Sequence, residues 1–176
     1  YLTKTERALG LESKDPIENM KQLRRVADNL TYAAIESTGE MIDFSEAMKN
    51  AGPALRILGK DIEEGTAALM ALANQGHVGS EAGTQLYMVY RDLQRAFITN
   101  RATWERLSLS VYDSNREMMN IADIIRQLEE HFSGLSDEEI RMTLMMLGFQ
   151  DRSLRATQAL FGLSKVIRKY ENDLKQ

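Results

Sequence analysis

The stretch that decides the fold is residues 61–113, DIEEGTAALMALANQGHVGSEAGTQLYMVYRDLQRAFITNRATWERLSLSVYD. It predicts two helices joined by a glycine turn, then a short helix and an extended segment. Asp61 is placed to cap the first helix, and Glu64 stands three positions on, as in a capping box. The second helix carries apolar residues at spacings that indicate one buried face: Leu86, Val89, Tyr90, Leu93 and Phe97.

The glycine turn has a simple structural interpretation. Gly76 suits the left-handed position after a helix, Gly79 completes the turn, and Ser80 is predicted to cap the second helix. Gly83, followed by Thr84, leaves room for close contact between helices. Such turns also bind phosphate, but a Walker A sequence needs a lysine after its last glycine, and the quoted stretch contains none. We therefore interpret the turn as a helix corner.

A helix is predicted from Asp15-Pro16 to Gly39, because proline fits the first helical position and glycine ends a helix. Its apolar residues form a seam of about two heptads: Met20, Leu23, Ala27, Leu30 and Ala34. A coiled coil needs three or four heptads, so we favour one helix packed on its neighbour. The alternative is a seam for another copy of the chain or for an upstream segment.

The next helix is predicted to start at Asp43 or Ser45 and to end at Gly59. Pro53 lies inside it, and proline removes one backbone hydrogen bond and clashes with the preceding turn. A kink or a break near Gly52-Pro53 is therefore expected.

Residues 101–107 predict a short helix, and residues 108–112 then alternate between polar and apolar side chains. This alternation favours a small two-strand hairpin near residues 109–119. Two strands alone are marginal in water, so such a hairpin has to lean on the helices.

Asn120 is placed to cap a helix with the most regular apolar stripe of the chain: Ile121, Ile124, Ile125, Leu128 and Phe132. Gly134 ends this helix, and Ser136 with Glu139 forms a second capping box.

The segment from Ile140 to Leu147 is apolar nearly all round, which is typical of a central helix. We expect Met142, Met145 and Met146 to fill an irregular core, because methionine adapts to gaps. The alternative is an adaptable groove for a partner.

Residues 151–161 predict another short helix, and residues 163–176 an amphipathic C-terminal helix. This end of the chain is rich in cations: Arg152, Arg155, Lys165, Arg168, Lys169 and Lys175. A basic helix can contact DNA or anionic lipid, but we favour a solvated face.

Composition sets outer limits on function. The net charge of −4 gives no electrostatic reason to expect nucleic acid. The absence of cysteine excludes disulfides and thiolate chemistry. No apolar run reaches the ~18 residues needed to span a bilayer. The chain begins at Tyr1 without a methionine, so we expect a fragment or a processed product.

Candidates for catalysis or metal binding were weighed and not supported. His77 and His131 are the only histidines, and neither has a second histidine three or four residues away. The pairs Glu63-Glu64 and Glu129-Glu130 are interpreted as capping or solvating their helices. We therefore predict no enzyme activity, no metal, no cofactor and no small-molecule substrate.

Several motifs resemble the core region of phage tail tape measure proteins, above all GHVGSEAGTQL at residues 76–86. Others are Ser110-Val111-Tyr112-Asp113, the helix over residues 121–128 and Gly134-Leu135-Ser136-Asp137, and the likeness runs over residues 32–162. The sequence departs from the family pattern at three places. It lacks a proline near residues 96–103, has Ser108 where glycine is usual, and has LGFQDR at 147–152 in place of a tighter Phe-Gly-x-Arg.

The resemblance implies a role in a phage or prophage tail. Tape measure proteins template the length of the tail tube, occupy its lumen, and leave before or during DNA ejection. The resemblance further implies four kinds of partner: tail tube proteins, tail-tip proteins, tail assembly chaperones and other copies of the chain. The implied locations are the tail lumen of the virion and, during assembly, the host cytoplasm. Within this family pattern, Gly76, Gly79, Ser80, Gly83 and Thr84 form a structural turn motif. The alternative function is a membrane- or DNA-contacting module used during genome delivery.

The predicted fold is all-α, a compact bundle of about eight short helices. We expect one domain over residues 1–176: a leading segment and helix at 1–30, the tape-measure-like core at 32–162, and the C-terminal amphipathic helix at 163–176.

Overall fold

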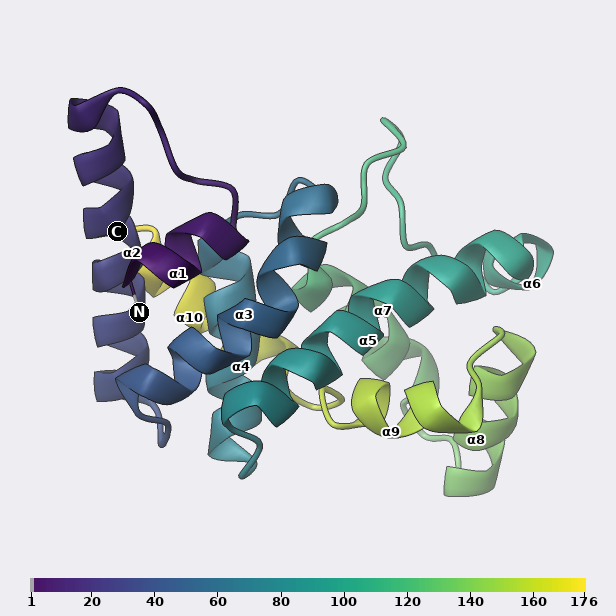
Figure 1. Cartoon of the computed structure of the whole chain (residues 1–176). Coiled ribbons are helices and arrows are strands. Elements are labelled where there is room, and N and C mark those ends of the chain that lie inside the picture. Colours follow the sequence, from purple (N-terminus) through teal and green to yellow (C-terminus); the bar gives the residue numbers. More distant parts are fainter. Residues whose placement is uncertain (1) are drawn as a thin grey trace. The chain divides into compact units, whose positions relative to one another are not determined.

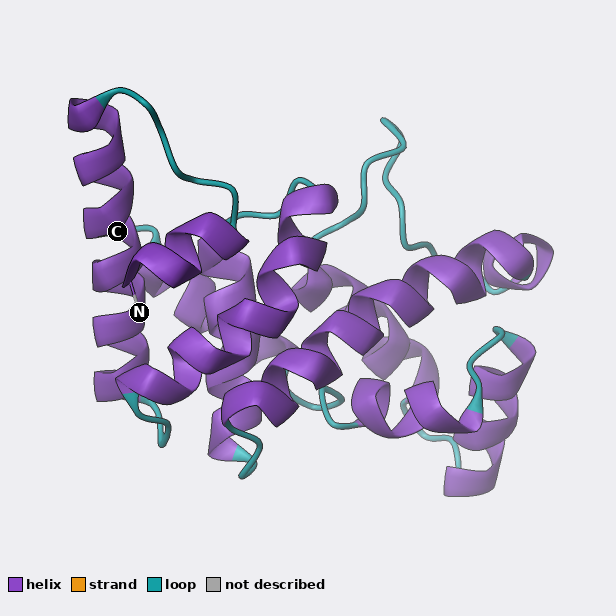
Figure 2. Ribbon diagram, in the orientation of Figure 1, coloured by secondary structure: helices purple, strands orange, loops and turns teal. Residues whose placement is uncertain are grey.

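The computed structural model describes residues 2–176, which form ten α-helices (Figure 1). Their bounds are α1 (Leu2–Ala8), α2 (Pro16–Glu36), α3 (Met41–Ile57), α4 (Ile62–Asn74), α5 (Gly79–Thr99), α6 (Arg101–Arg106), α7 (Ile121–Phe132), α8 (Asp137–Met146), α9 (Asp151–Gln158) and α10 (Ser164–Leu174). Figure 2 shows helices and loops and no strand among these residues. The all-α prediction is confirmed. The helix missed by the sequence analysis is α1, whose seven residues are too few to show a period.

The described residues divide into two compact units. The first comprises residues 2–87 and 166–176, and the second comprises residues 88–165. Helix α5 contributes to both units, because its residues run from 79 to 99. A single domain over residues 1–176 stays a prediction.

In the first unit, α4 lies at the centre of the packing. It packs against α2 and α3, while α1 packs against α2 and α3 (Figure 1). Every residue of α4 from Ile62 to Ala73 is buried. The predicted cap is confirmed, since the Asp61 side chain accepts a hydrogen bond of 2.9 Å from the Glu64 N–H. The helix ends as predicted, with Gly76 in the left-handed region at φ +89°.

Helices of the first unit approach one another closely where glycine replaces a larger side chain. A Cβ added to Gly83 of α5 would lie 2.1 Å from the carbonyl oxygen of Ala47 in α3. A Cβ on Gly65 of α4 would lie 2.4 Å from a methyl carbon of Leu55 in α3. At Gly83 the obstacle is backbone, so this glycine sets the distance of α5 from α3, whereas at Gly65 the Leu55 side chain would have to shift.

Helix α3 differs from its prediction at the start and at Pro53. It begins at Met41, and Glu40 and Asp43 form a reciprocal capping box in which the Glu40 N–H donates to Asp43 Oδ2 at 2.9 Å. Asp43 is therefore the third helical residue, and neither it nor Ser45 starts the helix. Of the expected kink or break, the break does not occur, because α3 runs without interruption from 41 to 57, and the kink stays a prediction. Pro53 is exposed, so water can satisfy the backbone carbonyl that loses its partner.

The second unit has an aromatic core around Trp104 of α6. The Trp104 side chain is fully buried, and its Nε1–H donates to the Leu147 carbonyl oxygen at 2.9 Å. Phe97 meets the indole edge to face at 5.8 Å between ring centroids, and Phe149 lies at 6.1 Å. The predicted stripe of α7 is buried throughout, and Asn120 caps that helix as predicted through the Ala122 N–H. The Trp104 indole therefore joins α5, α6 and the segment after α8 in one buried core.

The expected hairpin is reduced to one antiparallel bridge, between Tyr112 and Met118. Gln127 of α7 supports this loop in place of a second strand. Its side-chain amide donates to the Ser110 carbonyl oxygen at 3.1 Å, and its Oε1 accepts from the Ser110 N–H at 3.3 Å. A side chain of the neighbouring helix thus provides the ladder hydrogen bonds that a longer strand would have provided.

The prediction that the methionines of α8 fill the core is wrong. Within α8 only Leu144 is buried, whereas Met142, Met145 and Met146 are 56%, 56% and 51% exposed. Helix α8 therefore packs through the side that carries Leu144. Helix α2 packs on its neighbours as predicted, and its buried face is Val26, Asn29, Leu30 and Ala33, so the predicted seam is buried at Leu30 and exposed at Met20.

The end of α6 contains a residue in an unfavourable backbone conformation. The Leu109 N–H donates to the Trp104 carbonyl and the Ser108 N–H to the Glu105 carbonyl, which is a Schellman motif with Ser108 in the glycine position. Ser108 has φ +59°, in the left-handed region. Related sequences are expected to have glycine at this position, and the left-handed conformation of Ser108 explains that preference for glycine.

We predict that Ser108→Gly raises the free energy of unfolding. A left-handed conformation costs a residue with a Cβ roughly 1–2 kcal/mol, partly offset by the greater flexibility of glycine in the unfolded chain, so a gain of about 0.5–1 kcal/mol is expected. Urea unfolding followed by circular dichroism measures it. The matched control is Ser114→Gly in the same loop, where φ is not positive. An equal or larger gain at the control position would contradict the account.

Candidate functional site

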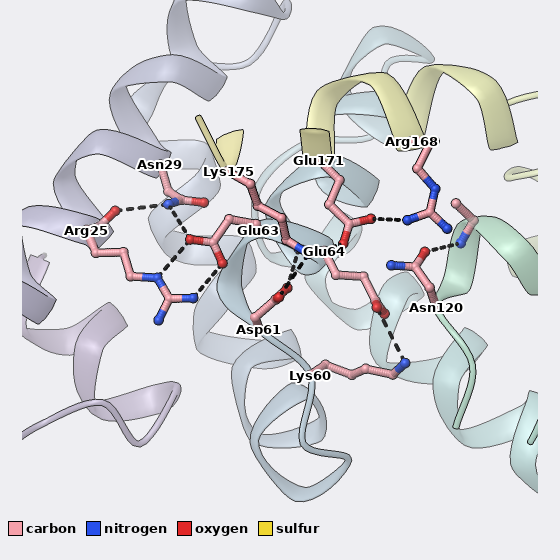
Figure 3. A network of polar contacts seen from close by, with 11 residues as sticks. Arg25, Asn29, Lys60, Asp61, Glu63, Glu64, Asn120, Arg168, Glu171 and Lys175 are labelled. Carbon is pink, nitrogen blue, oxygen red and sulfur yellow. Dashed lines mark hydrogen bonds and ion pairs between the residues drawn. The ribbon is translucent and has the colours of Figure 1, made fainter. Parts of the chain in front are cut away.

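Charged side chains are buried where the first turn of α4 meets α2 and α10 (Figure 3). Three carboxylates lie there almost without solvent contact: Glu63 is 5% exposed, Glu64 4% and Glu171 1%. Burying an ionised carboxylate is costly unless a cation and hydrogen bonds compensate it. Each of the three therefore needs a partner, and the neighbouring helices supply them.

Glu63 is paired with α2. Arg25 binds it through two parallel hydrogen bonds, from Nε at 2.8 Å and from Nη2 at 2.6 Å. Asn29 donates to the Arg25 carbonyl at 3.0 Å and to Glu63 Oε1 at 3.5 Å. This two-pronged geometry fixes the orientation of both side chains, and hydrogen bonding to Glu63 raises the pKa of Arg25. The pair ties α2 to the start of α4.

Glu64 is paired within its own segment. Lys60 Nζ lies 3.4 Å from Glu64 Oε1, and the side chain of Lys60 is only 8% exposed. This lysine precedes the Asp61 cap, so the loop before α4 brings both a cap and a cation to the same turn.

Helix α10 contributes the third carboxylate and two cations. Arg168 Nη1 lies 3.2 Å from Glu171 Oε2, and Lys175 donates to Glu171 Oε1 at 2.9 Å. Lys175 also lies 3.3 Å from Oδ2 of Asp61, the residue that caps α4. The hydrogen bond to Glu171 and the nearby Asp61 carboxylate raise the pKa of Lys175. The last turn of α10 is thereby joined to the first turn of α4 (Figure 3).

A second polar contact joins α10 to α2. The Tyr32 hydroxyl donates to Asp173 Oδ2 at 2.9 Å, and Lys169 donates to the same oxygen at 3.0 Å. Burial, the hydrogen bond to Asp173 and the charge of nearby carboxylates raise the pKa of Tyr32 to about 12. Lys169 and Tyr32 together lower the pKa of Asp173. Polar contacts therefore join α10 to α2 as well as to the first turn of α4.

This network corrects two expectations from the sequence. Glu63-Glu64 was interpreted as capping or solvating a helix, but both side chains are buried and paired. Arg168 and Lys175 were assigned to a solvated basic face, but they bind Glu171 and Asp61 inside the chain. One feature of the sequence could have revealed the network. Helix α4 is apolar on nearly every side, yet Glu63 and Glu64 stand in its first turn.

The network joins α2, α4 and α10 of the first unit through paired charges. Among residues 2–176 no group of three or more His, Asp or Glu side chains is placed to hold a metal ion. His77 lies near Gln85 at 3.3 Å and Glu81 at 3.8 Å, both on the surface side of α5. The arrangement can fix the positions of α2, α4 and α10 relative to one another, which is a structural task.

The predicted turn motif begins with Gly76 between α4 and α5, and its other four residues lie in the first two turns of α5. Gly76 and Gly79 have φ values of +89° and +64°, so both occupy the left-handed region. Helix α5 begins at Gly79, so Ser80 lies inside its first turn and is not the N-cap. Ser80 and Thr84 instead face α3, because the Asn50 side chain donates to the Ser80 carbonyl at 3.0 Å and to Thr84 Oγ1 at 3.2 Å. With Gly83 against Ala47, these contacts place the start of α5 on α3.

We predict that Arg25→Met lowers the free energy of unfolding by about 2 kcal/mol. The substitution leaves Glu63 buried without its cation, and removing one partner of a fully buried pair costs about 3–5 kcal/mol. Arg25 is 38% exposed, so water compensates part of the loss. The control is Lys49→Met, which removes an exposed pair with Glu46 and is expected to change stability by less than about 0.5 kcal/mol. Equal effects in urea unfolding would refute the assignment.

We also predict a loss of stability at alkaline pH that depends on Tyr32. The folded state holds the phenol proton of Tyr32 more strongly than the unfolded chain does, where the pKa is 10.0. The stability that Tyr32 contributes is therefore complete below pH 10 and is lost as the pH rises to about 12. Urea unfolding across this range should show a shallower decline for Tyr32→Phe than for the parent chain. Identical slopes for the two proteins would show that Tyr32 does not titrate in this way.

The chain is similar to known proteins of phage tails. A family model described as phage-related minor tail protein matches residues 1–148. The tape measure protein of Pneumococcus phage Dp-1 is 32% identical over 154 residues, which cover 88% of this chain and 13% of that protein. No solved structure matches the chain. The resemblance to tape measure proteins is therefore confirmed, and the chain belongs to the phage-related minor tail protein family.

Proposed function

We propose that this chain is a folded part of a tape measure protein, which templates the length of the tail tube and takes part in tail assembly and DNA ejection. The observation that supports this most is the similarity to the tape measure protein of phage Dp-1 along 88% of the chain. The similarity covers 13% of that relative, so the role in length determination belongs to the whole protein and the role of this segment is narrower.

Family membership gives the chain a structural role in the phage tail, and thus a place in the virion among other tail components. Within that role, we propose tail tube proteins, tail-tip proteins and tail assembly chaperones as its contacts. The proposed locations are the tail lumen in the virion and the host cytoplasm during assembly.

The segment acts as a folded contact unit and not as a stretch of extended ruler. A single helix of 176 residues would measure about 260 Å at 1.5 Å per residue. The longest helices described, α2 and α5, have 21 residues each, or about 32 Å. The helices are short, several end at a glycine, and polar networks fix them to one another. Such a segment presents defined surfaces to partners and adds little to the length of a ruler.

The alternative of a membrane- or DNA-contacting module receives less support. None of the described helices is both long and apolar enough to cross a bilayer. Two of the cations that motivated this alternative, Arg168 and Lys175, bind carboxylates within the first unit. Contact with other tail proteins therefore remains the function that the geometry supports best.

Two in-frame deletions in the intact tape measure gene test the proposal. Removing the codons of residues 2–176 should abolish tail assembly or DNA delivery, because a folded contact unit is lost. Removing an equal number of codons from a long helical stretch of the same protein should leave tails that assemble but are shorter, by about 1.5 Å per residue. Electron microscopy and plaque counts measure both. Infectious tails that are merely shorter after the first deletion would contradict the proposal.

A further inference from the structure

Two exposed apolar surfaces remain outside the packing and the networks described above. The first, here the α2 surface, consists of Pro16, Ile17, Met20, Lys21 and Arg24, which line a groove of about 420 Å³. Ile17 is 82% exposed and Met20 64%. Met20 belongs to the predicted seam that another copy of the chain could cover. In the structure it lies outside the buried face of α2.

The second, here the α8 surface, consists of Met142, Met145 and Met146 with Asp137 and Glu138 one turn before them. The three methionines are each more than half exposed. Methionine is flexible and polarizable, so a methionine surface can adapt to the side chains of a partner helix. This corresponds to the alternative that the sequence analysis left open for these residues.

The charges that flank the two surfaces are opposite and uncompensated. Lys21 and Arg24 on α2 form no ion pair with any other described residue. Asp137 and Glu138 on α8 likewise have no cationic partner among residues 2–176. A basic apolar surface and an acidic apolar surface on one chain are complementary to each other across two copies.

The spacing of charge and apolar side chain is the same on both helices. On α2, Lys21 follows Ile17 by four residues, and Arg24 follows Met20 by four. On α8, Met142 follows Glu138 by four. Four residues are one helical turn, or about 6 Å. The apolar side chains and the opposite charges can therefore meet at the same time, provided that the two helices run antiparallel.

We propose that copies of this chain associate head to tail, with the α2 surface of one copy against the α8 surface of the next in antiparallel orientation. The contact is heterologous, because it joins two different surfaces. Each copy that joins leaves one free surface of each kind, so association continues to a closed ring or an open chain. This property belongs to the chain in solution and does not depend on the proposed function.

Sedimentation velocity over a range of protein concentrations tests the contact. One variant alters the α2 surface, Ile17→Gln with Met20→Gln, and the other alters the α8 surface, Met142→Gln with Met146→Gln. All four residues are exposed, so circular dichroism should show unchanged helix content. The parent chain should form dimers and larger species, and each variant alone should bind itself at least about tenfold more weakly. Ile57→Gln, at an exposed position of α3 outside both surfaces, is the matched control and should behave as the parent.

The mixture of the two variants distinguishes this contact from a symmetric one. Each variant keeps one intact surface, so an equimolar mixture should form a heterodimer and stop there. A contact of α8 with α8, or of α2 with α2, would leave one variant fully able to associate with itself. A parent chain that stays monomeric up to about 1 mM, or a mixture that stays monomeric, would overturn the proposal.

Charge reversal provides a second, independent measurement. Lys21→Glu with Arg24→Glu should weaken association, and Asp137→Lys with Glu138→Lys should do the same. Mixing the two reversed variants should restore binding between the reversed surfaces, because the α2 surface of one and the α8 surface of the other again carry opposite charges. A mixture no stronger than either variant alone would overturn the antiparallel arrangement.

Discussion

The first unit depends on the burial of α4 with its charged first turn. All residues from Ile62 to Ala73 are buried, yet Glu63 and Glu64 are among them. Such a helix is stable only when neighbouring elements provide cations and hydrogen bonds at that turn, which Arg25 and Lys60 do. Asp61 both caps α4 and binds Lys175, so local helix geometry and the attachment of α10 depend on the same carboxylate. The network is thus a constraint on where α2 and α10 can lie.

Features encoded by neighbouring residues were predicted well. The caps at Asp61, Asn120 and Ser136 and the glycine after α4 were read from the sequence, because each is decided within one helical turn. The stripe from Leu86 to Phe97 is buried as expected, since a regular period on a long helix has one interpretation. The hairpin predicted near residues 109–119 is reduced to one bridge, and Gln127 of α7 supports the loop.

Features decided by distant residues were not predictable in the same way. The run from Ile140 to Leu147 is apolar nearly all round, so its pattern does not show which side packs, and in the structure only Leu144 of α8 is buried. The partner of Glu63 lies 38 residues away on another helix, so no local pattern of the sequence shows the pair. In the turn motif, the conformations of the glycines could be predicted from the sequence. The contacts of Ser80 and Thr84 with Asn50 could not, because they depend on where α3 lies.

Short helices fixed by caps, glycine contacts and a buried ionic network give a protein that presents defined surfaces, as a structural tail component must. Hydrogen exchange measured residue by residue tests the central role of α4 most directly. The backbone amides of Leu69, Met70 and Leu72 should exchange slowest in the first unit, through unfolding of that whole unit. Exchange of these amides as fast as that of α1 would show that α4 opens locally and that the unit is not organised around it.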